Sequence, residues 1–484
     1  MRPFNTCLLT MAFLIIAAGP VLITLGEEQE EPRVDSHPPI YYDGSSASLE
    51  PPEGMTGNGT GSDPYLISGF WLNTTDSPGI EIVNSTDHIV VDFNLFTGGV
   101  PLRHPGISIV NSTNVTIRNV ATYYCTRGIE IINSSGIIVS DSGFFGSYDG
   151  IYIEGRGIIV ERVLCKVNVN NGILVNRSGN IVLRNVISES NTAILGITAG
   201  IHIVDSNDID IIETTCSLNY GYGVIVEPSN PSVRMERIRI SGSYIDTNNN
   251  GIMMTNVDDS VIEDSTLQYN TNGLLLSFSA AFRLEDCWVY KNTYGAFLSD
   301  SSEVEILGSD FDRNENAVYL DSTRNSTISN NRFTNGTWHA ITIDTWLDMG
   351  PPSRFNRVHD NEFRLNGPIG CQVMDNGENN SWSEGTSGNL WSDHWGPDAD
   401  NDSIVDEPYV IDGLANATDP YPRAFEKEDS RDIDEKEEPS DEEEKDDGEL
   451  FWLLMAASGG TIIALGAGIL VFTKGGRDRS PLSS

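Results

Sequence analysis

Four aspartates toward the C-terminal side of the chain have the spacing of a cation-binding loop. Asp398, Asp400 and Asp402 place carboxylates at alternate positions, Asp406 adds a fourth, and the carbonyl of Ile404 lies between them. Calcium prefers oxygen ligands of this kind, supplied at alternate positions of a short loop. These five residues are therefore predicted to bind one calcium ion.

The same loop departs from an EF-hand loop at two positions. Ser403 stands where a glycine normally makes the sharp turn, and Tyr409 stands where a bidentate glutamate would complete the ligand shell. A solvated acidic turn without a bound ion is therefore the alternative interpretation of this segment.

Catalytic residues cannot be assigned from the sequence. Hydrolysis or elimination on a polysaccharide needs paired carboxylates, or a base with a charge-neutralising partner. Asp and Glu total 70, so pairs on one face are expected by chance. Copper(I) prefers Cys, Met and His, but the seven histidines are scattered without the spacing of metal ligands.

A repeated sequence motif, called the repeated phrase below, runs through the interior of the chain. It is expected to form the scaffold that positions any functional residues. It consists of Gly, an apolar-x-apolar triplet and a polar turn, as in GIEIVNST from Gly79 and GLLLSFS from Gly273. Ten copies begin with Gly, and two later copies begin with Ala317 and Ala340. Eight of the eleven steps between copies are 22 or 23 residues, and three are 27 or 28, as expected where loops are inserted at a turn.

The apolar residues of each copy alternate with polar ones, which is the period of a strand and not of a helix. Ile129 and Ile131, and likewise Ile151 and Ile153, are predicted to point to one face. Three short strands and three turns in 22 residues make one coil of a parallel β-helix. The sequence therefore predicts an all-β solenoid of about twelve coils of ~22 residues. A leucine-rich horseshoe has a similar period, but the sequence lacks its consensus and its helical return.

Two residue types are interpreted as structural. Asparagines three residues ahead of a Gly or Ala are predicted to form a turn ladder along the rod, namely Asn248, Asn270, Asn292 and Asn314. Cys165 and Cys216 occupy similar positions two coils apart, a separation of about 9.6 Å that excludes a disulfide. With Cys125, Cys287 and Cys371, they are expected to be free thiols.

The coil pattern resembles the NosD-like, right-handed parallel β-helix repeats that are grouped with carbohydrate-binding and sugar-hydrolase (CASH) modules. Gly57–Phe70 (GNGTGSDPYLISGF) looks like the opening motif of archaeal-type surface members, and Gly388–Tyr409 (GNLWSDHWGPDADNDSIVDEPY) is similar to their closing motif. The resemblance covers about residues 56–423. It implies a right-handed β-helix, whereas the members of this group share coils more than chemistry.

Both flanking phrases are predicted to be caps, because an open β-helix end exposes unpaired strand edges. Sugar stacking by the tryptophans is the alternative. The aromatic residues available for this cover are Tyr65, Phe70, Trp71, Trp382, Trp391 and Trp395.

The two ends of the chain have the composition of membrane-targeting segments. The apolar run Cys7–Leu25 predicts a secretory signal, with an uncleaved anchor as the alternative. Leu450–Phe472 has 23 residues without a charge, which is enough to cross about 30 Å of hydrocarbon. Lys474, Arg477 and Arg479 follow it, so the positive-inside rule places the tail in the cytoplasm and all that precedes the span outside.

The expected organisation follows from these segments. It comprises a signal peptide (1–26), a linker (27–55), an N-terminal cap (56–78), the repeats (79–365), a C-terminal cap with the acidic loop (366–425), a disordered acidic stalk (426–449), a transmembrane helix (450–473) and a cytoplasmic tail (474–484).

The net charge argues against one class of binding partner, and the sequons mark candidate glycosylation sites. With 29 Lys and Arg against 70 Asp and Glu, the net charge of −41 argues against nucleic acid. Twelve N-x-S/T sequons are glycosylation candidates in an exported protein, at Asn58, Asn73, Asn84, Asn111, Asn114, Asn133, Asn176, Asn325, Asn335, Asn379, Asn401 and Asn416.

The sequence thus predicts a single-pass cell-membrane protein whose extracellular β-helix binds or presents at the surface, with a glycan or a surface protein as partner. A polysaccharide lyase, hydrolase or epimerase on the same scaffold is the alternative. A NosD-type copper accessory role is the third and least favoured function.

Overall fold

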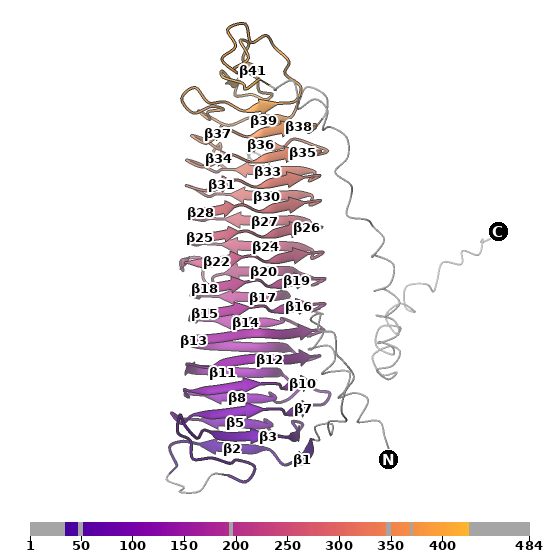
Figure 1. Ribbon diagram of the computed structural model, residues 1–484, viewed down its shortest axis with the longest axis vertical. Helices are drawn as coiled ribbons and strands as arrows, with labels where there is room; N and C mark the ends of the chain where they lie inside the picture. Colours follow the sequence, from indigo (N-terminus) through magenta and orange to yellow (C-terminus); the bar gives the residue numbers. More distant parts are fainter. Residues whose placement is uncertain (1–33, 47–51, 193–196, 345–349, 368–370, 425–484) are drawn as a thin grey trace, which may run out of the picture. The chain divides into compact units, whose positions relative to one another are not determined.

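The computed structural model describes residues 34–46, 52–192, 197–344, 350–367 and 371–424. Within these ranges the chain forms strands and no helix. Nearly all strands pair in parallel with the coil before and the coil after, so that the coils pile up along a rod (Figure 1). The predicted all-β solenoid of about twelve turns is confirmed.

Each coil contributes one strand to each of three stacks. Stack 1 carries the repeated phrase and contains β2 (Ile40–Asp43), β5 (Ile80–Val83), β8 (Ile107–Val110), β11 (Arg127–Ser135), β13 (Asp149–Lys166), β14 (Ile173–Asn176), β17 (Ala199–Val204), β20 (Tyr222–Glu227), β24 (Asn250–Thr255), β27 (Asn272–Ser277), β30 (Tyr294–Ser299), β33 (Asn316–Asp321), β36 (Ile341–Asp344) and β39 (Val373–Asp375).

Stack 2 follows stack 1 in each coil. It contains β3 (Tyr65–Ser68), β6 (Ile89–Asp92), β9 (Val115–Arg118), β12 (Ile138–Phe145), β15 (Gly179–Arg184), β18 (Asn207–Ile212), β21 (Met235–Glu236), β22 (Ile238–Ser241), β25 (Val257–Glu263), β28 (Ala280–Glu285), β31 (Glu305–Leu307), β34 (Thr327–Ser329) and β37 (Arg357–His359).

Stack 3 completes each coil. It contains β1 (Asp35–His37), β4 (Phe70–Asn73), β7 (Leu95–Thr97), β10 (Ala121–Tyr123), β16 (Ile187–Glu189), β19 (Thr215–Ser217), β23 (Tyr244–Asp246), β26 (Thr266–Gln268), β29 (Trp288–Tyr290), β32 (Asp310–Asp312), β35 (Arg332–Thr334), β38 (Glu362–Arg364) and β40 (Leu390–Trp391). The long strands β12 and β13 turn a corner and pair in more than one stack.

The core is a column of apolar side chains inside the rod. Ile129, Ile131, Ile151 and Ile153 are fully buried, which confirms the predicted inward face of stack 1. Alternation places every second residue inside, so each inward position packs mainly on the same position of the neighbouring coils.

Stacked side chains form ladders that supply hydrogen-bond partners to buried backbone groups at the corners between strands. The Asn270 Oδ1 atom accepts the backbone N–H of Asn248 at 2.9 Å, and Asn292 and Asn314 repeat this bond in the next coils at 2.9 Å each. The predicted asparagine ladder is confirmed. The described cysteines are free, and Ser188 separates Cys165 from Cys216 along stack 3, as the two-coil spacing predicted.

The N-terminal end of the solenoid begins earlier than expected. The strands β1 and β2 lie within the segment interpreted as a linker, and β3 and β4 lie within the segment interpreted as a cap. Ile40 pairs with Ile80 of β5, so β2 is a full member of stack 1. The repeated phrase does not identify β2, because no glycine precedes Ile40.

The C-terminal end is closed by aromatic stacking and a short hairpin. Rings continue from the core into the cap, with centroid distances of 5.1 Å for Phe333–Phe363, 4.4 Å for Phe363–Trp391 and 3.9 Å for Trp391–Tyr409. The antiparallel pair β41 (Tyr409–Val410) and β42 (Thr418–Asp419) follows.

The tryptophans assigned to the two caps divide into buried and exposed ones. Trp382 and Trp391 are buried in the C-terminal cap. Trp71 and Trp395 are exposed, so they do not belong to the buried part of either cap, and their role as cover stays a prediction.

In the part of the chain that the structure describes, no helix has the length and apolar character needed to cross a membrane. The predicted signal segment, stalk, transmembrane helix and cytoplasmic tail lie outside the described residues.

Candidate functional site

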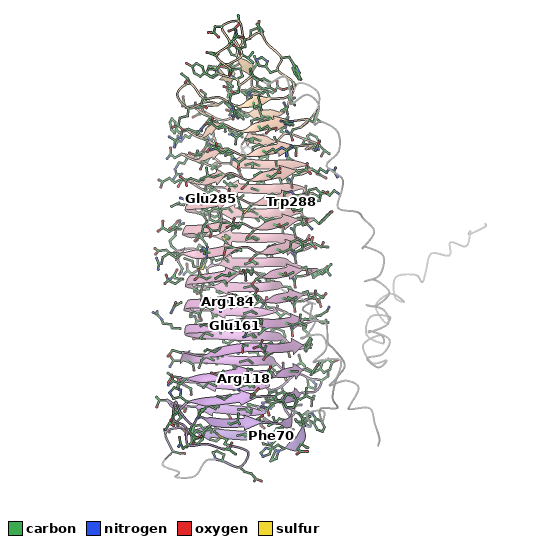
Figure 2. The ribbon with its side chains drawn as sticks, in the orientation of Figure 1. Phe70, Arg118, Glu161, Arg184, Glu285 and Trp288 are labelled. Atoms are coloured by element: carbon green, nitrogen blue, oxygen red, sulfur yellow. The ribbon has the colours of Figure 1, made fainter. Side chains whose placement is uncertain are left out.

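The outer face of stack 3 carries accessible aromatic side chains. Each strand of this stack is short, so its first and third residues and the following corner residue point outward. Between β23 and β29 these outward positions include Tyr244, Tyr269 and Trp288, which are 38–43% exposed. Figure 2 labels Trp288 on this stack and Glu285 on stack 2 at the same level of the rod.

Lys291 lies beside one of these rings, that of Tyr269, and beside the buried ring of Tyr290. Its ammonium is 5.5 Å from the centroid of the Tyr269 ring and 5.1 Å from that of the Tyr290 ring. The two tyrosine rings meet edge to face at 5.5 Å, and Tyr290 also stacks on Trp288 at 4.9 Å. Tyr269 and Lys291 both have positive φ at the corner after a strand, which lets their side chains stand side by side on successive coils.

A shallow open groove of about 710 Å³ runs past this cluster. Its lining is polar apart from Tyr269, and its charged residues are Lys291, Arg313 and Glu315. We call this feature, together with Trp288 and Tyr290 at its border, the aromatic–cation groove. It offers ring faces, hydroxyls, amides and cations on one accessible surface.

Hydrogen bonds hold the groove's border in place. The Gln268 Nε2 atom donates to the Tyr244 hydroxyl and, at 3.2 Å, to Asp246 Oδ1. Arg313 Nη1 donates to the Tyr290 hydroxyl at 3.5 Å. These bonds join successive coils, so the aromatic rings are fixed by the scaffold.

Two pKa values in the groove are raised. Burial and the neighbouring Tyr290 raise the pKa of the Tyr269 hydroxyl above its ordinary value. A hydrogen bond to Tyr290 raises the pKa of the Lys291 ammonium. Both groups therefore keep their protons at neutral pH, which suits binding and disfavours either of them as a general base.

The outer face of stack 2 differs from this surface because its cations are paired across coils. Arg118 binds Asp92 at 2.9 Å, and Arg283 binds Glu305 at 3.0 Å. Pairs of this kind recur along the stack, including Arg162–Asp141 at 2.7 Å and Arg184–Glu161 at 2.5 Å.

The predicted calcium loop brings three of its four carboxylates together. Oxygens of Asp398, Asp400 and Asp402 lie within 4.8 Å of one another on the surface. Asp398 accepts the backbone N–H groups of Asp402 and Ser403, both at 3.1 Å, whereas Asp406 accepts that of Ala399 at 3.1 Å. Calcium binding here stays a prediction.

The predicted glycosylation sites are mostly exposed. Asn176 is half-buried and donates to the Tyr152 hydroxyl, and the other eleven sequon asparagines are exposed. Asn133 and Asn111 stack in neighbouring coils, since the Asn133 amide donates to Asn111 Oδ1 at 2.8 Å. Their modification stays a prediction.

One pair of metal-ligating residues was missed by the sequence analysis. His339 Nε2 lies 3.1 Å from Cys371 Sγ. Each residue stands two positions before its strand, and Ile341 of β36 pairs with Val373 of β39, so the register of stack 1 brings the pair together. Thiolate and imidazole are ligands that copper(I) accepts, and the pair fits that ion in ligand type.

The groove was also missed, although a signal for it is present. Tyr269, Lys291 and Arg313 follow one another at steps of 22 residues. Alignment of the sequence on the coil period would have placed them in one column.

Two family models match the chain. One, described as a right-handed β-helix region, matches residues 60–216, and the other, described as the periplasmic copper-binding protein NosD, matches residues 232–396. These two matches support a relation to NosD-like right-handed β-helix proteins. The matches support the resemblance that the repeated phrase carries, whereas the closer likeness to CASH modules and archaeal surface proteins stays a prediction.

No curated protein matches this NosD-like chain. Similar solved structures include the A-module of the mannuronan C-5 epimerase AlgE6 of Azotobacter vinelandii, at 11% identity and a TM-score of 0.46, covering 68% of this chain and 88% of that one. A tailspike mutant of the E. coli bacteriophage HK620 in complex with a hexasaccharide matches at 9% identity and a TM-score of 0.47, covering 69% and 68%. At these values the likenesses carry no argument about function.

Proposed function

We propose that this protein recognises glycan chains outside the cell, with the aromatic–cation groove as its binding site. The observation that carries the proposal is the pair of exposed rings of Tyr269 and Trp288 near Lys291, both packed on the buried Tyr290. In this proposal the acidic stalk and Leu450–Phe472 hold the rod at the membrane.

Aromatic rings suit sugars because each ring combines a large apolar face with a fixed orientation, and neighbouring amides and hydroxyls supply the hydrogen bonds. Exposed apolar side chains also occur on earlier coils of stack 3 and its corner, at Tyr124, Val167, Ile187 and Leu218. A row of such positions at a spacing of about 4.8 Å per coil suits an extended chain better than a small ligand.

A polysaccharide-modifying enzyme is less well supported by the same groove. Abstraction of a proton next to a sugar carboxylate needs a group that is unprotonated near neutral pH. The raised pKa values of Tyr269 and Lys291 keep both protonated. The bordering Asp312 accepts hydrogen bonds from Thr334 at 2.7 Å and from Asn335 at 3.0 Å, which ties it to the scaffold.

The full chain, purified in detergent, should bind a subset of a glycan array. The variants Trp288→Ala and Tyr269→Ala should weaken that binding by about tenfold or more, because each removes one stacking face. Phe278→Ala is the matched control, since Phe278 is an exposed aromatic residue of the same coil at a different corner. Equal binding by all three variants would refute the groove as the site.

Copper handling is a second candidate, favoured by the His339–Cys371 pair. Copper(I) would bind the imidazole and the Cys371 thiolate, and the thiol proton would leave to solvent; burial and Asp412 raise the pKa of this thiol, which works against binding near neutral pH. Titration of the full chain with copper(I) against a chelator of known affinity tests this role. Loss of one equivalent in Cys371→Ser, with no loss in Cys287→Ser, is the expected result, and no stoichiometric binding by the unmodified chain would exclude it.

Calcium at the acidic loop belongs to the same proposal as a structural ion. The loop precedes β41 of the C-terminal hairpin. A bound cation would stiffen the cap and take no part in glycan recognition.

A further inference from the structure

Lys291 is an unusual cation in this protein. Two of the six lysines lie in the described part of the chain. Lys166 forms an ion pair with Glu189, whereas the Lys291 ammonium contacts the rings of Tyr269 and Tyr290. Within the described ranges no carboxylate forms an ion pair with Lys291.

The lack of an ion pair at Lys291 is shared by some arginines of the described ranges, among them Arg156 and Arg177, for which no carboxylate lies at ion-pair distance. The net charge is −41, so carboxylates are the most abundant partners on the surface. The cations of stack 2 use them across neighbouring coils, as in Arg118–Asp92. Even the next cation along the same column, Arg313, has Asp312 at 3.8 Å. Lys291 instead contacts two tyrosine rings, and no described carboxylate lies at ion-pair distance from its ammonium, although Glu315 lines the same groove.

The location of this charge indicates what would compensate it. Lys291 lines the groove beside the exposed ring of Tyr269. A cation over aromatic rings keeps its charge and loses part of its hydration, so an incoming anion forms a stronger contact there than at a fully hydrated lysine. The anion must belong to a molecule that also covers the rings.

We propose that the groove selects acidic glycans, with Lys291 binding the anionic group of a sugar whose ring stacks on the neighbouring aromatic side chains. This inference rests on the glycan recognition proposed above and names the chemical class of the ligand. The anionic group is a uronate carboxylate or a sulfate ester, which share their charge and their acceptor oxygens.

The test compares matched ligands on the full chain. Oligogalacturonate and its methyl ester differ in charge and share their sugar rings, and a sulfated neutral oligosaccharide of equal length forms the third arm. We expect oligogalacturonate or the sulfated ligand to bind about tenfold more tightly than the methyl ester. Whichever charged ligand binds more tightly identifies the anionic group.

Lys291→Gln should remove this preference, so that the charged ligand falls to the affinity of the methyl ester while the ester's own affinity is unchanged. Lys291→Arg should keep most of the preference. Lys166→Gln makes the same change of charge at a paired lysine and should leave all affinities unchanged. Circular dichroism spectra that coincide with the unmodified protein establish that each variant is folded.

The possible failures are distinguishable. Equal binding of the charged and esterified ligands, or a preference that survives Lys291→Gln, refutes acidic selectivity and leaves glycan recognition intact. Equal losses in Lys291→Gln and Lys166→Gln show a general charge effect and also refute the role of Lys291. Absence of binding to every oligosaccharide refutes the glycan-binding function together with this inference.

Discussion

The asparagine ladder allows a sharp test of what holds the coils together. Asn270 is 4% exposed, and its Oδ1 accepts the backbone N–H of Asn248 at 2.9 Å. Its Nδ2 donates to the carbonyls of Ile245 at 3.1 Å and Gln268 at 2.7 Å. Alanine at position 270 would therefore leave the Asn248 N–H and the Ile245 carbonyl, both of the preceding coil, without these partners, whereas the Gln268 carbonyl keeps the Thr247 N–H at 3.2 Å.

The size of the effect follows from these groups. Each unsatisfied buried polar group costs about 1–3 kcal/mol, so Asn270→Ala should lower the free energy of unfolding by about 2–6 kcal/mol. Asn272, two residues later in the same coil, is half-buried and its side chain donates at 2.6 Å to Asn250. Water can replace that bond, so Asn272→Ala should cost less than about 1 kcal/mol.

Hydrogen exchange is the appropriate measurement, because coils that contact only their neighbours can open locally. In Asn270→Ala the amide of Asn248 should lose its protection, together with amides of the adjoining coils, while distant coils keep theirs. Urea unfolding of both variants gives the accompanying change in free energy. If Asn270→Ala loses no more stability than Asn272→Ala, the ladder is a consequence of coil stacking and not one of its causes.

Three further outcomes follow from buried and acidic groups. Ile131→Asp should destabilise the solenoid by more than about 4 kcal/mol, because it buries a carboxylate in the core. Ile132→Asp, on the outer face of the same strand, should cost less than about 1 kcal/mol. Equal melting temperatures of the two variants would contradict the inward assignment of Ile131. Asp419→Asn should cost about 1–3 kcal/mol and alter tryptophan fluorescence, because one carboxylate oxygen accepts both a backbone N–H at 2.7 Å and an indole N–H at 3.0 Å. Calcium should raise the melting temperature more than magnesium at equal ionic strength, and the Asp400→Ala, Asp402→Ala double variant should abolish the difference; equal effects of the two ions would argue for screening of self-repulsion instead.

Periodic features of the fold could be predicted from the sequence. The inward placement of Ile131 and Ile153 and the hydrogen-bonded contact between Asn248 and Asn270 follow from the repeat, since stacked coils place equivalent positions on top of one another. The strand β2 could not be predicted in this way, because it has the register of stack 1 without the glycine that marks the other strands.

The candidate site was harder to predict because it depends on outward residues. His339 and Cys371 are 32 residues apart, and the longer spacing of their coils conceals that they are neighbours. Tyr269 and Lys291 do stand one period apart, but a tyrosine and a lysine share no pattern that a search for repeated residues would detect. Alignment on the coil period would place Tyr269 and Lys291 in one column, but it would not show which unlike side chains in that column contact each other.

The difference between inward and outward residues explains why the outer face of stack 3 is informative about function. Inside the rod each position is fixed by the coils on either side, so a buried isoleucine such as Ile153 reports on packing alone. Outside, the backbone ladder forms whatever the outward side chain is, and stack 2 shows that an acidic solenoid can cover such positions with paired charges. Tyr290 is buried and packs within the scaffold, but nothing in coil stacking requires the exposed rings of Tyr269 and Trp288 to lie beside it and Lys291. A cluster that the scaffold does not need, on the face that it leaves accessible, is best explained by what it binds.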